Sequence, residues 1–176
     1  MEKKKIIIAI IVVAIIILIG GMFVFFNGKS TETSIKNTSK KSMTAEDIVN
    51  LLKEKISYVG EYVIYTEETD LNKLLGRPNQ YISKITFEDT RLEQTNKDNE
   101  FLSEEERKEP IGGTIEVFSN NKDLDTRKKY IETLSSSASM FNQYIYSSDN
   151  ALFRLDSDLT PAQAQEYENA FLEIMK

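Results

Sequence analysis

The stretch QYIYSSDNALFRLDSDLTPAQAQEYENAF, residues 143–171, carries the strongest fold signals in the chain. Two apolar runs, QYIYS and ALFRL, flank the triplet SDN, whose Asp and Asn tolerate the left-handed backbone of a tight turn. A helix should follow, with Thr160 as N-cap, Pro161 at the first position and Gln163 completing a capping box. The stretch therefore predicts a β-hairpin followed directly by a helix.

Similar signals recur upstream of this stretch. Thr44 and Asp47 resemble a second capping box, and apolar residues then follow at helical spacing, so a helix is expected to begin there. A further helix is expected from Asp123. Apolar runs and alternation of apolar and polar residues predict strands over three segments: 62–65, 82–88 and 114–119.

The order of these elements predicts the fold class. Read along the chain it is helix, strand, strand, strand, helix, strand, strand, helix. Such an order favours an α+β domain, with a layer of helices packed on one mainly antiparallel sheet. We therefore expect a two-layer domain over residues 44–176, with the strand order left open.

Residues 6–26 form an apolar segment of 21 residues without a charge. As a helix it would reach about 31 Å, close to the thickness of the hydrocarbon core of a bilayer. This exceeds the apolar region of most cleaved signal peptides, so residues 1–26 are expected to be a signal-anchor transmembrane helix. Cleavage near Ser30 is the alternative.

Lys3, Lys4 and Lys5 precede the apolar segment and predict its orientation. Basic flanks stay in the cytoplasm, so we expect a single-pass protein of the cell membrane whose C-terminal domain is extracellular. Residues 27–43 are rich in Ser, Thr, Lys and Asn and are expected to form a flexible linker.

The composition of residues 44–176 narrows the range of partners. These 133 residues contain 15 Lys and Arg against 26 Asp and Glu, a net charge of −11. Such a surface repels nucleic acid, so no nucleic-acid partner is expected. The length suits one domain with a single core, and the absence of Cys means that no disulfide supports it.

The residue inventory also restricts catalysis. The chain contains no His and no Cys, which excludes Ser-His-Asp and Cys-His nucleophile systems and zinc sites that need imidazole or thiolate ligands. No glycine-rich phosphate-binding motif occurs, and no cofactor is expected. Paired carboxylates could serve a glycosidase. The candidate pairs are Glu67 with Glu68, Glu88 with Asp89, and Asp156 with Asp158.

One segment resembles a calcium-binding loop. Counted from Asn121, oxygen ligands fall at positions 1, 3, 5 and 12, the last being Glu132. Position 6 is Thr126 instead of Gly, and the next three residues are cations. Asp123 and Asp125 are better explained as residues that cap a helix and complement its dipole, so no metal site is expected.

A loop at residues 76–81 is the best candidate contact surface. Gly76 should end a helical turn and Pro78 should fix the backbone that follows, so the loop presents its polar side chains rigidly. These candidate binding residues are Arg77, Asn79, Gln80 and Tyr81. In the alternative, Arg77 pairs with an acid and Tyr81 packs in the core. The acidic segment 89–110, with 12 charged residues among 22, is a second possible contact surface.

Three segments carry a resemblance to known proteins. LLGRPNQY at 74–81, GGTIEVF at 112–118 and LFRLDSDLTPAQAQEYENAF at 152–171 resemble an uncharacterised extracytoplasmic domain of small membrane-anchored proteins and lipoproteins of Gram-positive bacteria. The resemblance implies an extracytoplasmic location but no reaction, cofactor or catalytic residue. Lipoproteins need a Cys for their lipid, and its absence here fits an anchor helix.

Together these observations predict a non-enzymatic, membrane-anchored cell-surface domain that binds a protein or an envelope component. The alternative is a carboxylate-dependent hydrolase that acts on cell-wall glycans, motivated by the abundance of acids.

Overall fold

The structure, a computed structural model, describes residues 43–96 and 99–176. The predicted anchor helix over 1–26 and the linker over 27–43, except for Met43, lie outside the described residues. No helix in the described part is long and apolar enough to cross a membrane. Residues Met43–Lys176 form one compact unit.

The helices begin where the sequence supplies caps. Complete capping boxes open α2 (Ala45–Lys55) and α5 (Pro161–Ile174), which confirms the helix starts predicted at Thr44 and Thr160, and a third capping box at Ser103 opens the short helix α3 (Glu104–Arg107). Helix α4 (Asn121–Ser137) starts two residues before the predicted Asp123, because Asn120 is its N-cap. The Asn120 side-chain oxygen accepts a hydrogen bond of 3.0 Å from the backbone N–H of Asp123.

Five strands form one antiparallel sheet in the order β1-β2-β3-β5-β4. Their bounds are β1 (Val59–Ile64), β2 (Tyr81–Asp89), β3 (Gly112–Phe118), β4 (Gln143–Ser148) and β5 (Ala151–Asp156). The predicted hairpin is confirmed as β4 and β5, and Asp149 takes the left-handed conformation at its turn, with φ of 47°. The α+β class is therefore confirmed, and the predicted order of elements is found with two short additions, α3 between β2 and β3 and a 3-10 turn, Ser139–Phe141, after α4.

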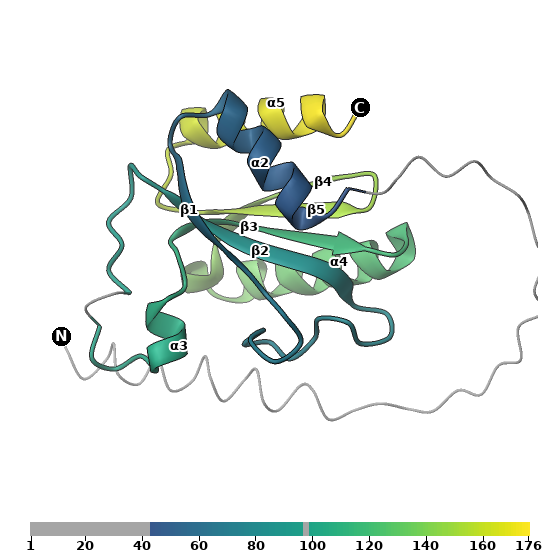
Figure 1. Cartoon of the computed structure of the whole chain (residues 1–176), viewed down its shortest axis with the longest axis horizontal. Helices are drawn as coiled ribbons and strands as arrows, with labels where there is room; N and C mark the ends of the chain where they lie inside the picture. The colour runs from purple at the N-terminus through teal and green to yellow at the C-terminus, as the bar shows by residue number, and fades with distance from the viewer. Residues whose placement is uncertain (1–42, 97–98) are drawn as a thin grey trace, which may run out of the picture. The chain divides into compact units, whose positions relative to one another are not determined.

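Helices α2 and α5 cover one face of the sheet, which we call the first face (Figure 1). The core there is almost entirely apolar. Phe153 of β5 lies at its centre, with its ring 5.1 Å from Phe171 of α5 and 6.1 Å from Phe87 of β2. Burial of these rings and of the aliphatic side chains around them is the main force that holds the fold together.

Helix α4 lies on the opposite side of the sheet, the second face, so the domain has three layers (Figure 1). Leu124 and Ile131 of α4 pack there against Phe118 and Leu152 of the sheet. The prediction of two layers was therefore wrong. The strand residues of this face include Lys84, Glu116 and Arg154, which in sequence look solvent-facing. Their burial is possible because Lys84 pairs with Asp70, and Glu116 pairs with Arg154 and with Arg127 of α4.

Candidate functional site

Five charged side chains are buried on the second face, and we call them the polar layer. They come from three strands, from α4 and from the connection between β1 and β2: Lys84, Glu116, Arg154, Arg127 and Asp70. Each has at most 16% of its side chain exposed. Charged residues are seldom buried unless they are paired, so the arrangement of these pairs determines what the face can do.

Glu116 is the centre of the polar layer. Its two carboxylate oxygens accept hydrogen bonds from Nε (3.1 Å) and Nη2 (3.0 Å) of Arg127, and Oε1 also accepts from Nη2 of Arg154 at 3.0 Å. Burial by itself would raise the pKa of Glu116, but the charges of Arg154 and Arg127 outweigh burial and lower it to about 2. Glu116 is therefore ionised and shared by two guanidinium groups.

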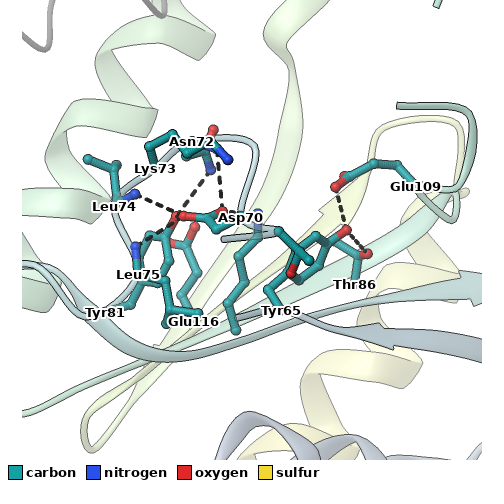
Figure 2. A network of polar contacts seen from close by, with 12 residues as sticks. Tyr65, Asp70, Asn72, Lys73, Leu74, Leu75, Tyr81, Thr86, Glu109 and Glu116 are labelled. Atoms are coloured by element: carbon teal, nitrogen blue, oxygen red, sulfur yellow. Dashed lines mark hydrogen bonds and ion pairs between the residues drawn. The ribbon is translucent and has the colours of Figure 1, made fainter. Parts of the chain in front are cut away.

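Asp70 fixes the connection between β1 and β2 (Figure 2). Its carboxylate accepts hydrogen bonds from Lys84 Nζ (2.9 Å), from the Tyr81 hydroxyl (2.7 Å) and from the backbone N–H groups of Leu74 (2.9 Å) and Leu75 (3.0 Å). Burial opposes ionisation, but Lys84 and these hydrogen bonds lower the pKa of Asp70 to about 2. One buried carboxylate thus holds the loop that precedes β2.

Tyr65 joins the sheet to the acidic segment (Figure 2). Its hydroxyl lies 2.8 Å from the hydroxyl of Thr86 and donates a hydrogen bond to Glu109, and Lys84 Nζ lies 4.2 Å from the centre of its ring. Burial, followed by the hydrogen bond to Glu109, raises the pKa of Tyr65. Glu109 is thereby held beside the second face.

A pocket of about 320 Å³ opens on this face beside the polar layer. The strand register places Thr86 of β2, Thr114 of β3 and Arg154 of β5 side by side across the sheet, and all three line the pocket. Gln143, Glu109 and Asp156 contribute the other polar side chains considered below. A pocket of this size suits a small ligand or one end of a larger one.

Arg154 is the least satisfied cation of the polar layer. It shares one carboxylate oxygen with Arg127, and its Nη1 donates at 3.2 Å to the neutral side chain of Gln143. Its Nε has no hydrogen-bond partner among the described residues. Burial, the largest influence, lowers the pKa of Arg154, so this site disfavours its charge more than water does.

The predicted contact loop lies at the other end of the sheet from the pocket, beside the hairpin turn at residues 149–150. Arg77 and Asn79 are exposed and Gln80 is half-buried. Tyr81 is fully buried and bonded to Asp70, so it does not belong to that surface, as the alternative interpretation expected. Gly76 and Asn79 give the loop its turns, since both have a left-handed backbone, with φ of 76° and 62°.

In the structure, the carboxylate pairs proposed from sequence do not face each other across a cleft. Glu88 and Asp89 are neighbours in β2 and therefore point to opposite faces. Asp89 is buried on the first face, where it pairs with Arg91 at 2.7 Å and accepts from Tyr167 at 2.8 Å. Glu67 and Glu68 are exposed, and Asp156 accepts from the backbone N–H of Asp158.

The calcium-like segment is part of helix α4 throughout residues 121–132. Asp123 lies at the third helical position and its carboxylate accepts from the Asn120 amide at 2.7 Å. The helix-start interpretation is therefore confirmed, with Asn120 instead of Asp123 as the capping residue. The part of the chain that the structure describes contains no group of three acids positioned to hold a metal ion.

Comparison of the chain with models of protein families, with curated proteins and with solved structures found no match. The resemblance to extracytoplasmic domains of Gram-positive bacteria therefore stays a prediction. The pocket residues Thr114 and Arg154 were missed by sequence reasoning. The only signal for them was the local alternation of polar and apolar residues over 114–117 in β3 and 153–156 in β5.

Proposed function

We propose that this chain is a non-enzymatic, membrane-anchored domain at the cell surface, and that it binds a protein or envelope component through the pocket on the second face. The membrane anchor is supported by the 21 uncharged apolar residues at 6–26 and by the three preceding lysines. The binding role is supported by the absence of His and Cys and by the pocket itself.

The single observation that carries the binding role is the pocket lined by Thr86, Thr114 and Arg154. Buried charges often stabilise a fold less well than apolar side chains of the same volume. The three buried cations of this layer therefore lower the free energy of unfolding relative to an apolar layer. Strained or costly arrangements of this kind concentrate at functional sites. The loop at Arg77, Asn79 and Gln80 is the second candidate surface.

Crosslinking in intact cells tests the proposal. A photo-crosslinking residue at Asn142, an exposed position that lines the pocket, should capture a partner, and the same residue at Glu132 on the outer side of α4 should not. Thr114→Phe, which fills the pocket, should abolish capture, whereas Thr114→Val, which keeps the volume, should retain at least part of it. Capture that Thr114→Phe leaves unchanged would contradict the pocket as the binding site.

The loop is tested in the same assay. If residues 76–80 form the binding surface, the combined change Arg77→Ala, Asn79→Gly and Gln80→Ala should abolish capture while Thr114→Phe has no effect. Glycine is used at position 79 because Asn79 has a positive φ, which alanine would strain.

The alternative function is a carboxylate-dependent hydrolase of wall glycans, and one observation favours it. The pocket is lined by two carboxylates, Glu109 and Asp156, and glycosidases use two acids across a cleft. Purified protein should then release soluble fragments from wall glycan, and Glu109→Gln and Asp156→Asn should each abolish the release. Absence of release by the unmodified chain would leave binding as the proposed function.

The proposed location has its own test. Protease added to intact cells should remove the domain, while the recovered protein keeps the N-terminal lysines at positions 3–5. Recovery of a mature chain that begins near Thr31 would contradict the anchor and support cleavage.

A further inference from the structure

The polar layer has an excess of positive charge. It contains three cations, Lys84, Arg127 and Arg154, but only two carboxylates, Asp70 and Glu116. Lys84 has Asp70 as its own partner, whereas the two arginines share Glu116. The unbalanced charge thus falls on the arginine pair, inside a domain whose net charge is −11.

Arg154 is the member of that pair which faces the pocket. Arg127 binds both oxygens of Glu116, the bidentate geometry that guanidinium prefers, while Arg154 receives one oxygen that is already shared. Thr114, the cross-strand neighbour of Arg154, carries a hydroxyl and lines the same pocket. A guanidinium beside a hydroxyl is suited to bind a carboxylate or phosphate oxygen.

The pocket also presents negative charge. Glu109 accepts a hydrogen bond from Tyr65, and Asp156 accepts at 2.8 Å from the backbone N–H of Asp158. Neither carboxylate forms an ion pair with a residue that the structure describes. A phosphate, with up to two negative charges, would be repelled by both, so the anion that binds Arg154 should bring a cation of its own.

The spacing of these charges suggests the size of the ligand. Asp156 lies two residues after Arg154 in β5, so the two side chains leave the same face about 7 Å apart along the strand. Two residues of extended peptide span about the same distance. The pocket volume, about 320 Å³, holds a molecule of this size.

We propose that the pocket binds a short zwitterion, a dipeptide or the like, whose carboxylate pairs with Arg154 and Thr114 and whose ammonium pairs with Asp156 or Glu109. This inference rests on the proposed function and specifies the chemistry of its ligand. In the terms of the proposed function, the envelope component that fits is a short peptide with both ends free.

Isothermal titration of the full-length protein in detergent tests the charge pattern with three probes. Glycylglycine has both charges, glycylglycinamide lacks the carboxylate, and N-acetylglycylglycine lacks the ammonium. We expect glycylglycine to bind, and each blocked probe to bind about 10- to 100-fold more weakly, the usual effect of losing one charge-assisted hydrogen bond. Inorganic phosphate should bind more weakly than glycylglycine.

Variants of the protein show which residues bind the carboxylate and which bind the ammonium of glycylglycine. Arg154→Gln should bind glycylglycine and glycylglycinamide equally, and Asp156→Asn combined with Glu109→Gln should no longer distinguish glycylglycine from its N-acetyl form. Since Arg154→Gln disturbs the pairing of Glu116 and could unfold the protein, Thr114→Val serves as a second variant that leaves every ion pair in place. It should weaken glycylglycine binding several-fold. Lys129→Gln, an exposed change on α4 away from the pocket, should leave the affinity unchanged.

Three results would overturn the inference. The first is that glycylglycine shows no saturable binding up to about 10 mM, a concentration that corresponds to a binding free energy of only about −3 kcal/mol. The second is that all three probes bind equally. The third is that the affinity is unchanged in both Arg154→Gln and Thr114→Val. The proposed function is judged separately. If Thr114→Phe abolishes crosslinking at Asn142 while glycylglycine does not bind, the pocket is the binding site and only the zwitterion inference fails.

Discussion

The two faces of the sheet are built on opposite principles. The first face meets α2 and α5 through an apolar core that includes Phe87, Phe153 and Phe171. The second face meets α4 through a smaller apolar cluster and a layer of five buried charges. Both faces bury most of their side chains, but the first does so mainly with apolar side chains that gain from burial, while the second must offset the desolvation of its charges by pairing them.

This difference separates the part of the domain that provides stability from the part that provides the candidate function. A five-stranded sheet with two helices on one face already has a continuous core. The second face has the smaller of the two apolar clusters and holds the pocket, so we interpret the first face as the main source of stability and the second as the place of function. Four predictions test that division, from the largest expected effect to the smallest.

Phe153→Ala should have the largest effect on stability. The ring is fully buried and contacts Phe87, Tyr146, Tyr167 and Phe171. Its removal leaves a cavity at the centre of the first face and should cost about 3–5 kcal/mol of the free energy of unfolding. Urea unfolding followed by circular dichroism measures this cost, and a loss below about 1 kcal/mol would contradict the importance given to the first face.

Glu116→Gln should cost about 3 kcal/mol, since it leaves two buried guanidinium groups without their carboxylate. The informative comparison is the triple change Glu116→Leu, Arg127→Leu and Arg154→Met. Apolar replacement of a whole buried ion-pair group is often neutral or stabilising, so this variant should recover most of the lost stability. It should also lose partner capture. A triple variant as unstable as Glu116→Gln would show that the polar layer is needed for folding.

Acid should destabilise the second face through Asp70 and Glu116, while the Asp89–Arg91 pair on the first face, where the pKa of Asp89 is also lowered, contributes equally to the acid sensitivity of both proteins compared below. The pKa values of Asp70 and Glu116 are lowered to about 2 in the folded protein, so the unfolded chain binds more protons at acid pH. Their contribution is complete above the unfolded values near 4 to 4.5 and is lost as pH falls toward 2. The urea midpoint should fall through this range, and it should fall less in the triple variant, which lacks Glu116. If the unmodified protein and the triple variant were equally sensitive to acid, Glu116 would not be one of the groups responsible.

Changes in the loop at 76–80 should have the smallest effect on stability. Arg77→Ala should change the free energy of unfolding by less than about 0.5 kcal/mol, because exposed side chains away from caps contribute little. Asn79→Ala should cost about 1 kcal/mol, because Asn79 has a left-handed backbone at φ of 62° that alanine disfavours. Asn79→Gly is the control and should be neutral or stabilising. Thermal unfolding of the three variants is sufficient to check these values.

Local signals in the sequence predicted most of the elements. Capping boxes at Thr44 and Thr160 set helix starts by hydrogen bonds within three residues, and the Asp149 turn joins β4 to β5 directly. The first face could also be predicted, because alternating apolar residues in β2 and β3 have to meet an apolar layer. The caps, the turn and the alternation each depend on residues close together along the chain, so a single sequence is enough to predict them.

Only the tertiary structure decided what lies on the second face. Lys84, Glu116 and Arg154 each look like solvent-facing strand residues, and nothing in the order of the sequence says that they meet one another or Arg127. Their burial depends on pairing between β2, β3, β5 and α4, so the strand order β1-β2-β3-β5-β4 had to be known first. The charged partners are separated by 11 to 38 residues in the sequence, so their pairing is non-local. Local sequence patterns therefore could not predict the third layer or the pocket.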